Sequence, residues 1–299
     1  MSALREYLSE GERAGQRYAL RLPRQTPRGA TGLALGQRAG SSLEFKDHRE
    51  YQVGDDLRHI DWNAYARSDQ LTVKLYREEI TPHLDLMLDA SRSMALEGTA
   101  KERATLALAA MLATASANAG FGHAVWLMSD EIRPLPNGNA APALWGEFEL
   151  NHRGSIPLTL PSPPNGGEGK GTGSSAWRTR GVRVLLSDLL WVGEPLLTLR
   201  SFTEGAAAAV VIQLLAESDV NPPEEGALRL IDAETEQMRE IHVDAAIARR
   251  YREALTRHQQ NWHRACRQTG AIFSTVVAET LLHDWKLDEL IAADFLRVI

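Results

Sequence analysis

The 299-residue sequence has little of three features by which common protein classes are recognised. It contains one cysteine, Cys266, which excludes an intramolecular disulfide and fits a reducing compartment. Its most apolar stretch, residues 206–215, is interrupted by Gln213 and is far shorter than the roughly 20 residues of a membrane helix. The first residues carry charges where a signal peptide needs an apolar centre. We therefore expect a soluble, cytoplasmic protein without membrane insertion.

The chain also lacks an excess of basic charge, because its formal net charge is −6, and this argues against a nucleic-acid-binding protein. Acidic residues are in turn absent from Arg13 to Leu43, a stretch that contains six arginines. We favour an interpretation in which this stretch pairs with the acidic surface of its own protein. A docking site for an acidic partner is the alternative.

Apolar, strand-like runs alternate with helical segments along most of the chain. The helices are expected from a capping box at Thr99 and Glu102 to Gly120, near 195–202, and from Asp244 to Gly270. The expected strands of the sheet are residues 83–89, 122–128, 182–187, 206–215 and 271–277, and two shorter strands are expected within 228–243. This alternation predicts an α/β fold with a mostly parallel central sheet flanked by helices.

We expect two parts in the chain. Residues 1–80, with a helix over 2–20 and a half-buried strand over 70–76, would form a smaller N-terminal accessory segment. Residues 81–299 would form the α/β domain.

One segment does not fit the alternating pattern. Residues 161–175 are almost entirely proline, glycine and serine, and cannot bury enough apolar surface to order themselves. We expect a disordered insert within the α/β domain at about residues 157–177.

The accessory segment carries many charges of both signs between residues 44 and 69. They are Arg49, Asp55, Asp56, Arg58, His59, Asp61 and Arg67. We favour a structural ion-pair network over a catalytic cluster. His59 and Asp61 could form an acid–base pair, but no nucleophile accompanies them.

The most informative polar cluster follows the first strand of the α/β domain. Asp89, Ser91 and Ser93 form a D-x-S-x-S pattern where the strand over 83–89 must turn toward a helix. Ligand sites of open α/β sheets collect at the carboxyl ends of strands, and Asp188 ends another parallel strand. Carboxylate and hydroxyl oxygens suit a hard cation such as Mg²⁺. Alternatively, the two serines only cap the following turn.

Three stretches of the chain resemble the bacterial domain of unknown function 58 family, a branch of the von Willebrand factor A-like domains. They are EFKDHREYQVGDDLRHIDWNAYARSDQLTVKLYREE (44–79), DASRSM (89–94) and VLLSDLL (184–190). The resemblance implies a Rossmann-like von Willebrand A fold with a metal-ion-dependent adhesion site for Mg²⁺ or Mn²⁺. Asp89, Ser91 and Ser93 match its first loop and Asp188 its later carboxylate.

The resemblance also implies a function. Domains of this kind bind protein partners through the ion and generally do no covalent chemistry. Relatives are commonly encoded beside MoxR-type AAA+ ATPases, which implies chaperone-like assembly or maturation of other proteins with such a partner.

The sequence departs from the family pattern at the threonine ligand of such sites. That loop is replaced by the proline- and glycine-rich insert, and Thr159, Thr172 and Thr179 lie nearby without a recognisable motif. A displaced loop would weaken or abolish metal binding. Arg92 lies between the two serines, so we expect its charge to face solvent.

The residue patterns, together with what the family resemblance implies, leave three functions to weigh. The first is a non-enzymatic, metal-dependent protein-interaction module. The second is a Mg²⁺-dependent hydrolase of phosphatase type with Asp89 as nucleophile, but that chemistry usually needs a carboxylate two residues later, where this chain has Ser91. The third is a scaffold with a degenerate metal site.

Overall fold

The computed structural model describes residues 2–21, 43–52, 60–78, 83–129, 131–150, 178, 180–191, 193–223, 225–233 and 236–299. The chain forms two compact units, each described below by itself. The α/β unit comprises Met1–Pro27 and Pro82–Ile299, and the second unit comprises Arg28–Thr81. The predicted insert at about 157–177 lies outside the described residues, and so do Thr159, Thr172 and Thr179.

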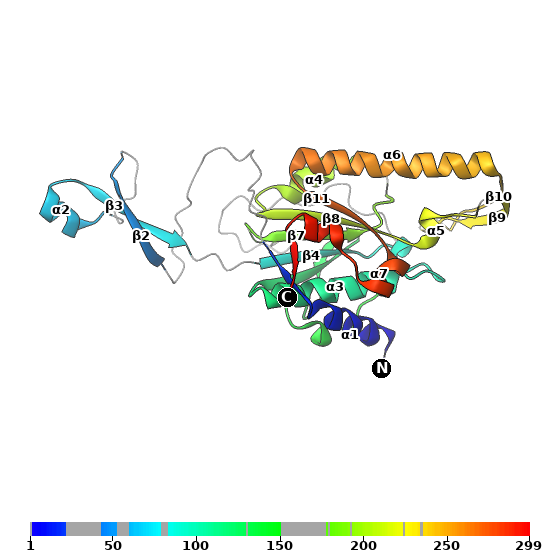
Figure 1. Cartoon of the computed structure of the whole chain (residues 1–299), viewed down its shortest axis with the longest axis horizontal. Helices are drawn as coiled ribbons and strands as arrows, with labels where there is room; N and C mark the ends of the chain where they lie inside the picture. The colour runs from blue at the N-terminus through cyan, green and yellow to red at the C-terminus, as the bar shows by residue number, and fades with distance from the viewer. Residues whose placement is uncertain are drawn as a thin grey trace. The chain divides into compact units, whose positions relative to one another are not determined.

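A six-stranded sheet forms the centre of the α/β unit, in the order β11-β8-β7-β4-β5-β6 (Figure 1). The first five strands in this order are mutually parallel, and β6 pairs antiparallel with β5. The strands are β4 His83–Asp89, β5 Gly122–Met128, β6 Ile132–Pro134, β7 Val182–Ser187, β8 Ala208–Leu215 and β11 Ile272–Val277. The predicted α/β class with a mostly parallel sheet is therefore confirmed. The sequence could indicate it because parallel strands buried on both faces are encoded by continuous apolar runs.

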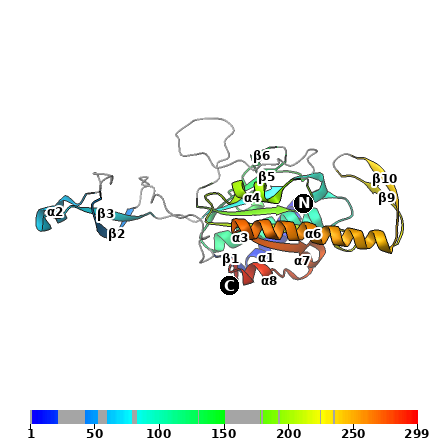
Figure 2. The same cartoon turned by 90° about the horizontal axis from the view of Figure 1, so that it is seen from above.

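Helices cover both faces of this sheet (Figures 1 and 2). The helices are α1 Ala3–Gly15, α3 Lys101–Asn118, α4 Pro195–Thr203, α5 Glu217–Val220, α6 Ala245–Thr269, α7 Ala278–Asp284 and α8 Asp288–Ala292, with short 3₁₀ turns η2 Arg92–Ala95 and η3 Pro142–Leu144. Alternation along β4 divides the core in two, since Leu86 and Leu88 pack in the cluster with α3 while Met87 packs in the cluster with α4 and α6. None of the described helices is long and apolar enough to cross a membrane.

The N-terminal residues belong to the α/β unit. The helix expected over residues 2–20 ends at Gly15, and β1 Tyr18–Leu20 then pairs antiparallel with β12 Leu296–Val298. Helix α1 packs closely on α3, because a Cβ at Gly11 would lie only 2.0 Å from the Ala107 carbonyl oxygen. The observed division therefore differs from the predicted boundary at residue 80. The contacts of α1 with α3 and of β1 with β12 join residues far apart in the sequence, so the local pattern did not indicate them.

The start of α3 also differs from the expectation. The predicted capping box is wrong, because the helix begins at Lys101 after Ala100, which makes no side-chain capping bond. Thr99 Oγ1 instead donates to the Leu96 carbonyl at 2.8 Å. Gly120 follows the helix with φ of 75°, as its left-handed role requires.

The C-terminal elements follow the sequence pattern closely. β9 Gly226–Ile231 and β10 Met238–Val243 form an antiparallel hairpin. The Asp244 carboxylate accepts the Ile247 N–H at 2.8 Å and so caps α6, which Gly270 ends at φ of 77°. Both predicted boundaries of this long helix are confirmed.

The second unit contains an antiparallel pair and one helix. β2 Leu43–Glu50 pairs with β3 Thr72–Glu78, near the strand expected at 70–76, and α2 Trp62–Ser68 lies between them in sequence. Asp61 Oδ1 accepts the N–H groups of Asn63 and Ala64 at 3.0 and 3.1 Å, so this carboxylate is a helix cap. Asp55, Asp56, Arg58 and His59 lie outside the described residues, and the role of the charged cluster stays a prediction.

Candidate functional site

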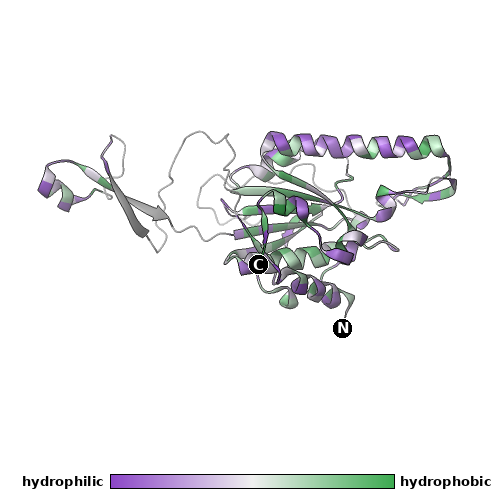
Figure 3. Ribbon diagram, viewed as in Figure 1, coloured by the Kyte–Doolittle hydropathy of each residue, from purple (hydrophilic) through white to green (hydrophobic). Residues whose placement is uncertain are grey.

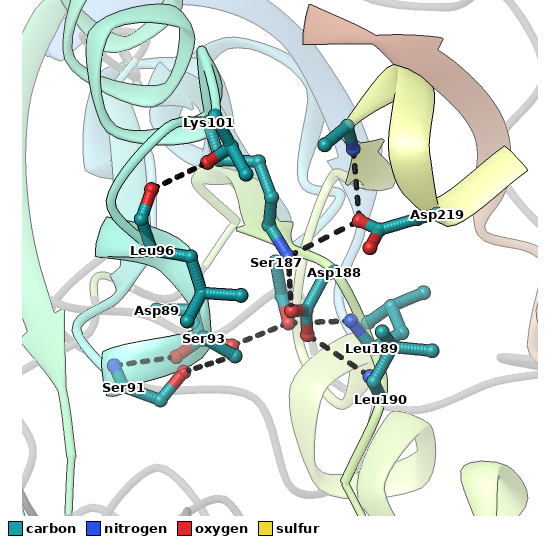
Figure 4. A network of polar contacts seen from close by, with 12 residues as sticks. Asp89, Ser91, Ser93, Leu96, Lys101, Ser187, Asp188, Leu189, Leu190 and Asp219 are labelled. Atoms are coloured by element: carbon teal, nitrogen blue, oxygen red, sulfur yellow. Dashed lines mark hydrogen bonds and ion pairs between the residues drawn. The ribbon is translucent and has the colours of Figure 1, made fainter. Parts of the chain in front are cut away.

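Two adjacent strand ends bring the predicted site residues together. β4 and β7 are parallel neighbours with Leu88 opposite Leu186, so Asp89 at the end of β4 lies near Ser187 and Asp188 at the end of β7 (Figure 4). Ser187 Oγ donates to Asp89 Oδ2 at 2.6 Å, which joins the two strand ends directly.

The D-x-S-x-S loop folds around the Asp89 carboxylate. Asp89 Oδ1 accepts the Ser91 N–H at 2.9 Å, and the hydroxyl oxygens of Ser91 and Ser93 lie 3.0 Å apart (Figure 4). Asp89 and Ser91 are buried, and Ser93 lies in η2 immediately after the turn. The loop therefore gathers one carboxylate and two hydroxyls, and Ser91, the N-cap of η2, makes no side-chain capping bond.

A buried lysine completes the cluster. Lys101 Nζ lies 2.7 Å from Asp188 Oδ2 and 3.4 Å from Asp219 Oδ2, and the Lys101 side chain is 1% exposed (Figure 4). The other Asp188 oxygen, Oδ1, accepts the Leu190 N–H at 3.0 Å. Lys101, Ser187 and Asp219 were not among the predicted site residues.

Negative charge exceeds positive charge in this cluster. Among the residues that the structure describes, the carboxylates of Asp188 and Asp219 pair with one ammonium, that of Lys101, and Asp89 adds a third carboxylate near Asp188. Burial, and then the Asp188 charge, raise the pKa of Asp89 to about 7, although hydrogen bonds from Ser187 and Ser91 act in the opposite direction. The pKa is raised mainly because burial disfavours the charged form of the Asp89 carboxylate.

The candidate site residues offer oxygen atoms as ligands. Among the described residues, no group of three or more His, Cys, Asp or Glu side chains could hold a metal ion. Asp89, Ser91, Ser93 and Asp188 instead offer two carboxylates and two hydroxyls, which are ligands that hard cations such as Mg²⁺ accept.

Arg92 links this loop to the β9–β10 hairpin. Its Nη1 lies 2.9 Å from Glu236 Oε1, and its side chain is 26% exposed. The expectation that Arg92 faces solvent therefore holds only partly, because an ion pair holds the guanidinium.

A second buried polar group lies in the first half of β4. Asp85 Oδ1 accepts the Trp126 Nε1–H at 3.1 Å, and its Oδ2 accepts the Arg178 N–H at 3.3 Å. His83 Nε2 is 3.5 Å from the same carboxylate. Asp85 precedes Asp89 by four residues of extended strand, roughly 13 Å, so it cannot act beside the D-x-S-x-S loop.

Comparison with known proteins gives uncharacterised relatives. The chain is 28% identical over 267 residues to uncharacterised protein Rv1480 of Mycobacterium tuberculosis H37Rv, covering 86% of this chain and 80% of that protein. Uncharacterised protein Mb1516 of Mycobacterium bovis matches with the same identity and coverage.

Two solved structures resemble this one weakly. BatB from Bacteroides thetaiotaomicron is 9% identical with a TM-score of 0.32, covering 71% of this chain and 98% of that one. An aerotolerance-related membrane protein from Bacteroides fragilis is 11% identical with a TM-score of 0.34, covering 68% and 95%. Scores this low do not establish a shared fold.

The family comparison is more decisive. The model described as "Protein of unknown function DUF58" matches residues 47–149 and 164–261, which is most of the chain and includes the whole D-x-S-x-S loop and Asp188. The chain therefore belongs to the DUF58 family.

Proposed function

We propose that this chain is a non-enzymatic protein-interaction module of the von Willebrand factor A type, with a Rossmann-like topology and a divalent cation at its binding face. Asp89, Ser91, Ser93 and Asp188 would hold the ion. The observation that carries the proposal is their convergence at the carboxyl ends of two adjacent parallel strands. Mg²⁺ or Mn²⁺ bound there would offer an open coordination position to a carboxylate of the partner.

The residues present fit such an ion in chemistry and in charge. All four side chains present oxygen, and the Lys101 ammonium is directed to Asp188 and Asp219 rather than to Asp89. Ser187 and the backbone N–H of Ser91 orient the Asp89 carboxylate. These bonds order the ligands before an ion arrives, which reduces the entropy cost of binding.

The partner that the family resemblance suggests is a MoxR-type AAA+ ATPase. We propose that the two proteins act together in the cytoplasm in chaperone-like assembly or maturation of other proteins. The uncharacterised mycobacterial relatives neither support nor oppose this assignment.

The phosphatase alternative is less well supported by the geometry. It needs a second carboxylate that can exchange protons beside Asp89, but Asp188 is paired with Lys101 and Asp85 is hydrogen-bonded to Trp126 elsewhere on β4. A scaffold with a degenerate ion site remains the third alternative.

Thermal unfolding in Mg²⁺, in Mn²⁺ and in EDTA tests the ion site on the intact chain. At about 100 times its Kd, an ion should stabilise the wild type by roughly 2.7 kcal/mol. Asp89→Ala should lose this increase. Asp85→Asn, which alters an equally buried carboxylate of the same strand, should keep it.

The outcomes separate the three functions. An ion-dependent Tm that disappears only in Asp89→Ala, with co-elution of the MoxR-type ATPase in Mg²⁺ but not in EDTA, would support the proposal. No ion effect in any variant would favour the degenerate scaffold. Hydrolysis of a phosphate ester that Asp89→Ala abolishes would favour the enzyme.

A further inference from the structure

An open cleft of about 920 Å³ lies along one edge of the sheet. The C-terminal half of α6 lines it with His263, Arg264 and Arg267, β11 lines it with Phe273 and Thr275, and α8 contributes Glu289. The cleft thus combines a helix, a strand and a carboxylate, and it shares no residue with the candidate ion site.

The strand in this cleft is the edge of the sheet. In the described part of the chain, β11 pairs only with β8. The Thr275 N–H donates to Glu289 Oε2 at 3.2 Å, so this amide points away from β8 and toward the cleft. Since backbone groups alternate along a strand, those of Phe273 and Val277 are expected to point the same way. Such an edge can pair with another extended chain.

Basic charge lines the helical side of the cleft. Helix α6 carries six arginines and one glutamate, whereas the whole chain has a net charge of −6. The outer face of α6 is correspondingly hydrophilic (Figure 3). Arg264 and Arg267 are exposed, and neither forms an ion pair within the residues that the structure describes. A ligand that supplies carboxylates would complement them.

We propose that this cleft binds an extended acidic segment of a partner protein. The segment adds as a strand to β11, and its carboxylates pair with Arg264 and Arg267. Strand addition supplies affinity through main-chain hydrogen bonds, and the arginines select for acidic sequence. Glu289 acts as an internal competitor, because its carboxylate occupies the Thr275 N–H that the incoming strand would use.

A random-peptide phage library selected on the intact protein in EDTA tests the proposal without reference to the ion site. Enrichment of sequences with several Asp or Glu in an extended pattern is expected, and these phage should not be recovered on Arg264→Glu/Arg267→Glu. Absence of acidic sequences, or equal recovery on the charge-reversed variant, would overturn the proposal.

Titration with a synthetic peptide from the selection gives two effects of opposite sign. Arg264→Glu/Arg267→Glu should raise Kd by about tenfold or more, while Glu289→Ala should lower Kd severalfold. Arg249→Glu/Arg250→Glu, on the same helix but outside the cleft, should change Kd much less. Equal weakening by both arginine pairs would indicate non-specific charge attraction and would overturn the proposed site.

Amide hydrogen exchange tests the strand geometry. Peptide binding should slow exchange in residues 272–277 and leave β4 unchanged. Binding without protection of β11 would contradict strand addition. A concentration-dependent dimer that Arg264→Glu/Arg267→Glu dissociates would show that a second copy of the chain, and not an acidic partner, occupies the cleft. Because Asp89→Ala should not affect these measurements, failure here is distinguishable from failure of the ion site.

Discussion

The ammonium of Lys101 lies 2.7 Å from Asp188 Oδ2 in a position from which the rest of the protein excludes water. A buried ion pair is costly to break from one side, because the remaining charge is left without a partner. We therefore expect the pair to affect both the stability of the strand ends and the net charge at the proposed ion site.

Lys101→Met should destabilise the protein in EDTA by about 3–5 kcal/mol, measured by chemical denaturation, because Asp188 loses its buried partner. Mg²⁺ should recover more stability in this variant than in the wild type, since the competing ammonium is gone. Lys286→Met is the control, because Lys286 pairs with Asp284 at the surface and is 68% exposed; it should cost at most about 1 kcal/mol. Equal effects of both substitutions would contradict a special role for Lys101.

His123 predicts a pH dependence of stability. Burial lowers its pKa below the ordinary 6.5, with the nearby His83 acting in the same direction and the hydrogen bond to the Ala140 carbonyl opposing both. The folded state therefore favours the neutral imidazole. The protein has its full stability above pH 6.5 and loses stability as the pH falls from 6.5 through the lowered pKa, because the unfolded state then binds a proton that the folded state does not.

Denaturation at pH 7.5 and pH 5.5 measures this effect. The wild type should lose stability at the lower pH, and His123→Gln should lose less. His242→Gln, on the exposed hairpin strand β10, should behave like the wild type. An unchanged pH slope in His123→Gln would rule out this histidine as the source.

Gly11 should not tolerate alanine. In an exposed helix interior, alanine is more stable than glycine by roughly 1 kcal/mol. At Gly11 the added Cβ would meet the Ala107 carbonyl at 2.0 Å, so Gly11→Ala should instead destabilise by about 1–3 kcal/mol. Ser9→Ala on the same helix should be close to neutral. A Gly11→Ala variant as stable as the wild type would show that α1 does not dock on α3 in this way.

Cys266 should be unreactive in the folded protein. Its side chain is fully buried, and burial raises the pKa of its thiol to about 12, so the reactive thiolate is scarce at neutral pH. Labelling with a thiol reagent should proceed only at the rate at which the protein unfolds, and denaturant should expose one thiol per chain. Rapid labelling of the native protein would contradict the packing of α6 on the sheet.

Local pattern predicted the elements whose signals are local. The strands Gly122–Met128 and Val182–Ser187 are found with the expected bounds, since their buried apolar runs end in turn residues. The same applies to α6, whose Asp244 cap and Gly270 stop are read directly from sequence. Pairing of β1 with β12 joins opposite ends of the chain, and no local pattern could reveal it.

The residues of the candidate site also fall into those that local sequence could reveal and those that it could not. Asp89, Ser91 and Ser93 are close in sequence, and Asp188 could be placed because it follows a predicted strand. Lys101 could not, because lysine is almost never fully buried and its position beside Thr99 and Glu102 suggested a capping box. The one available signal was a lysine at the start of an otherwise apolar helix.

The packing of α1 and β1 on the α/β unit has a consequence for how the chain can be divided. Because the chain leaves the α/β unit after β1 and re-enters it at β4, the second unit is an insertion in the α/β unit and is connected to it at both ends. A protein that begins at residue 81 would lack α1 and β1, which would expose one side of α3 and leave β12 without a partner. Replacing residues 28–81 with a flexible linker would instead preserve the core of the α/β unit, so excision rather than truncation is the way to obtain the candidate ion site without the second unit.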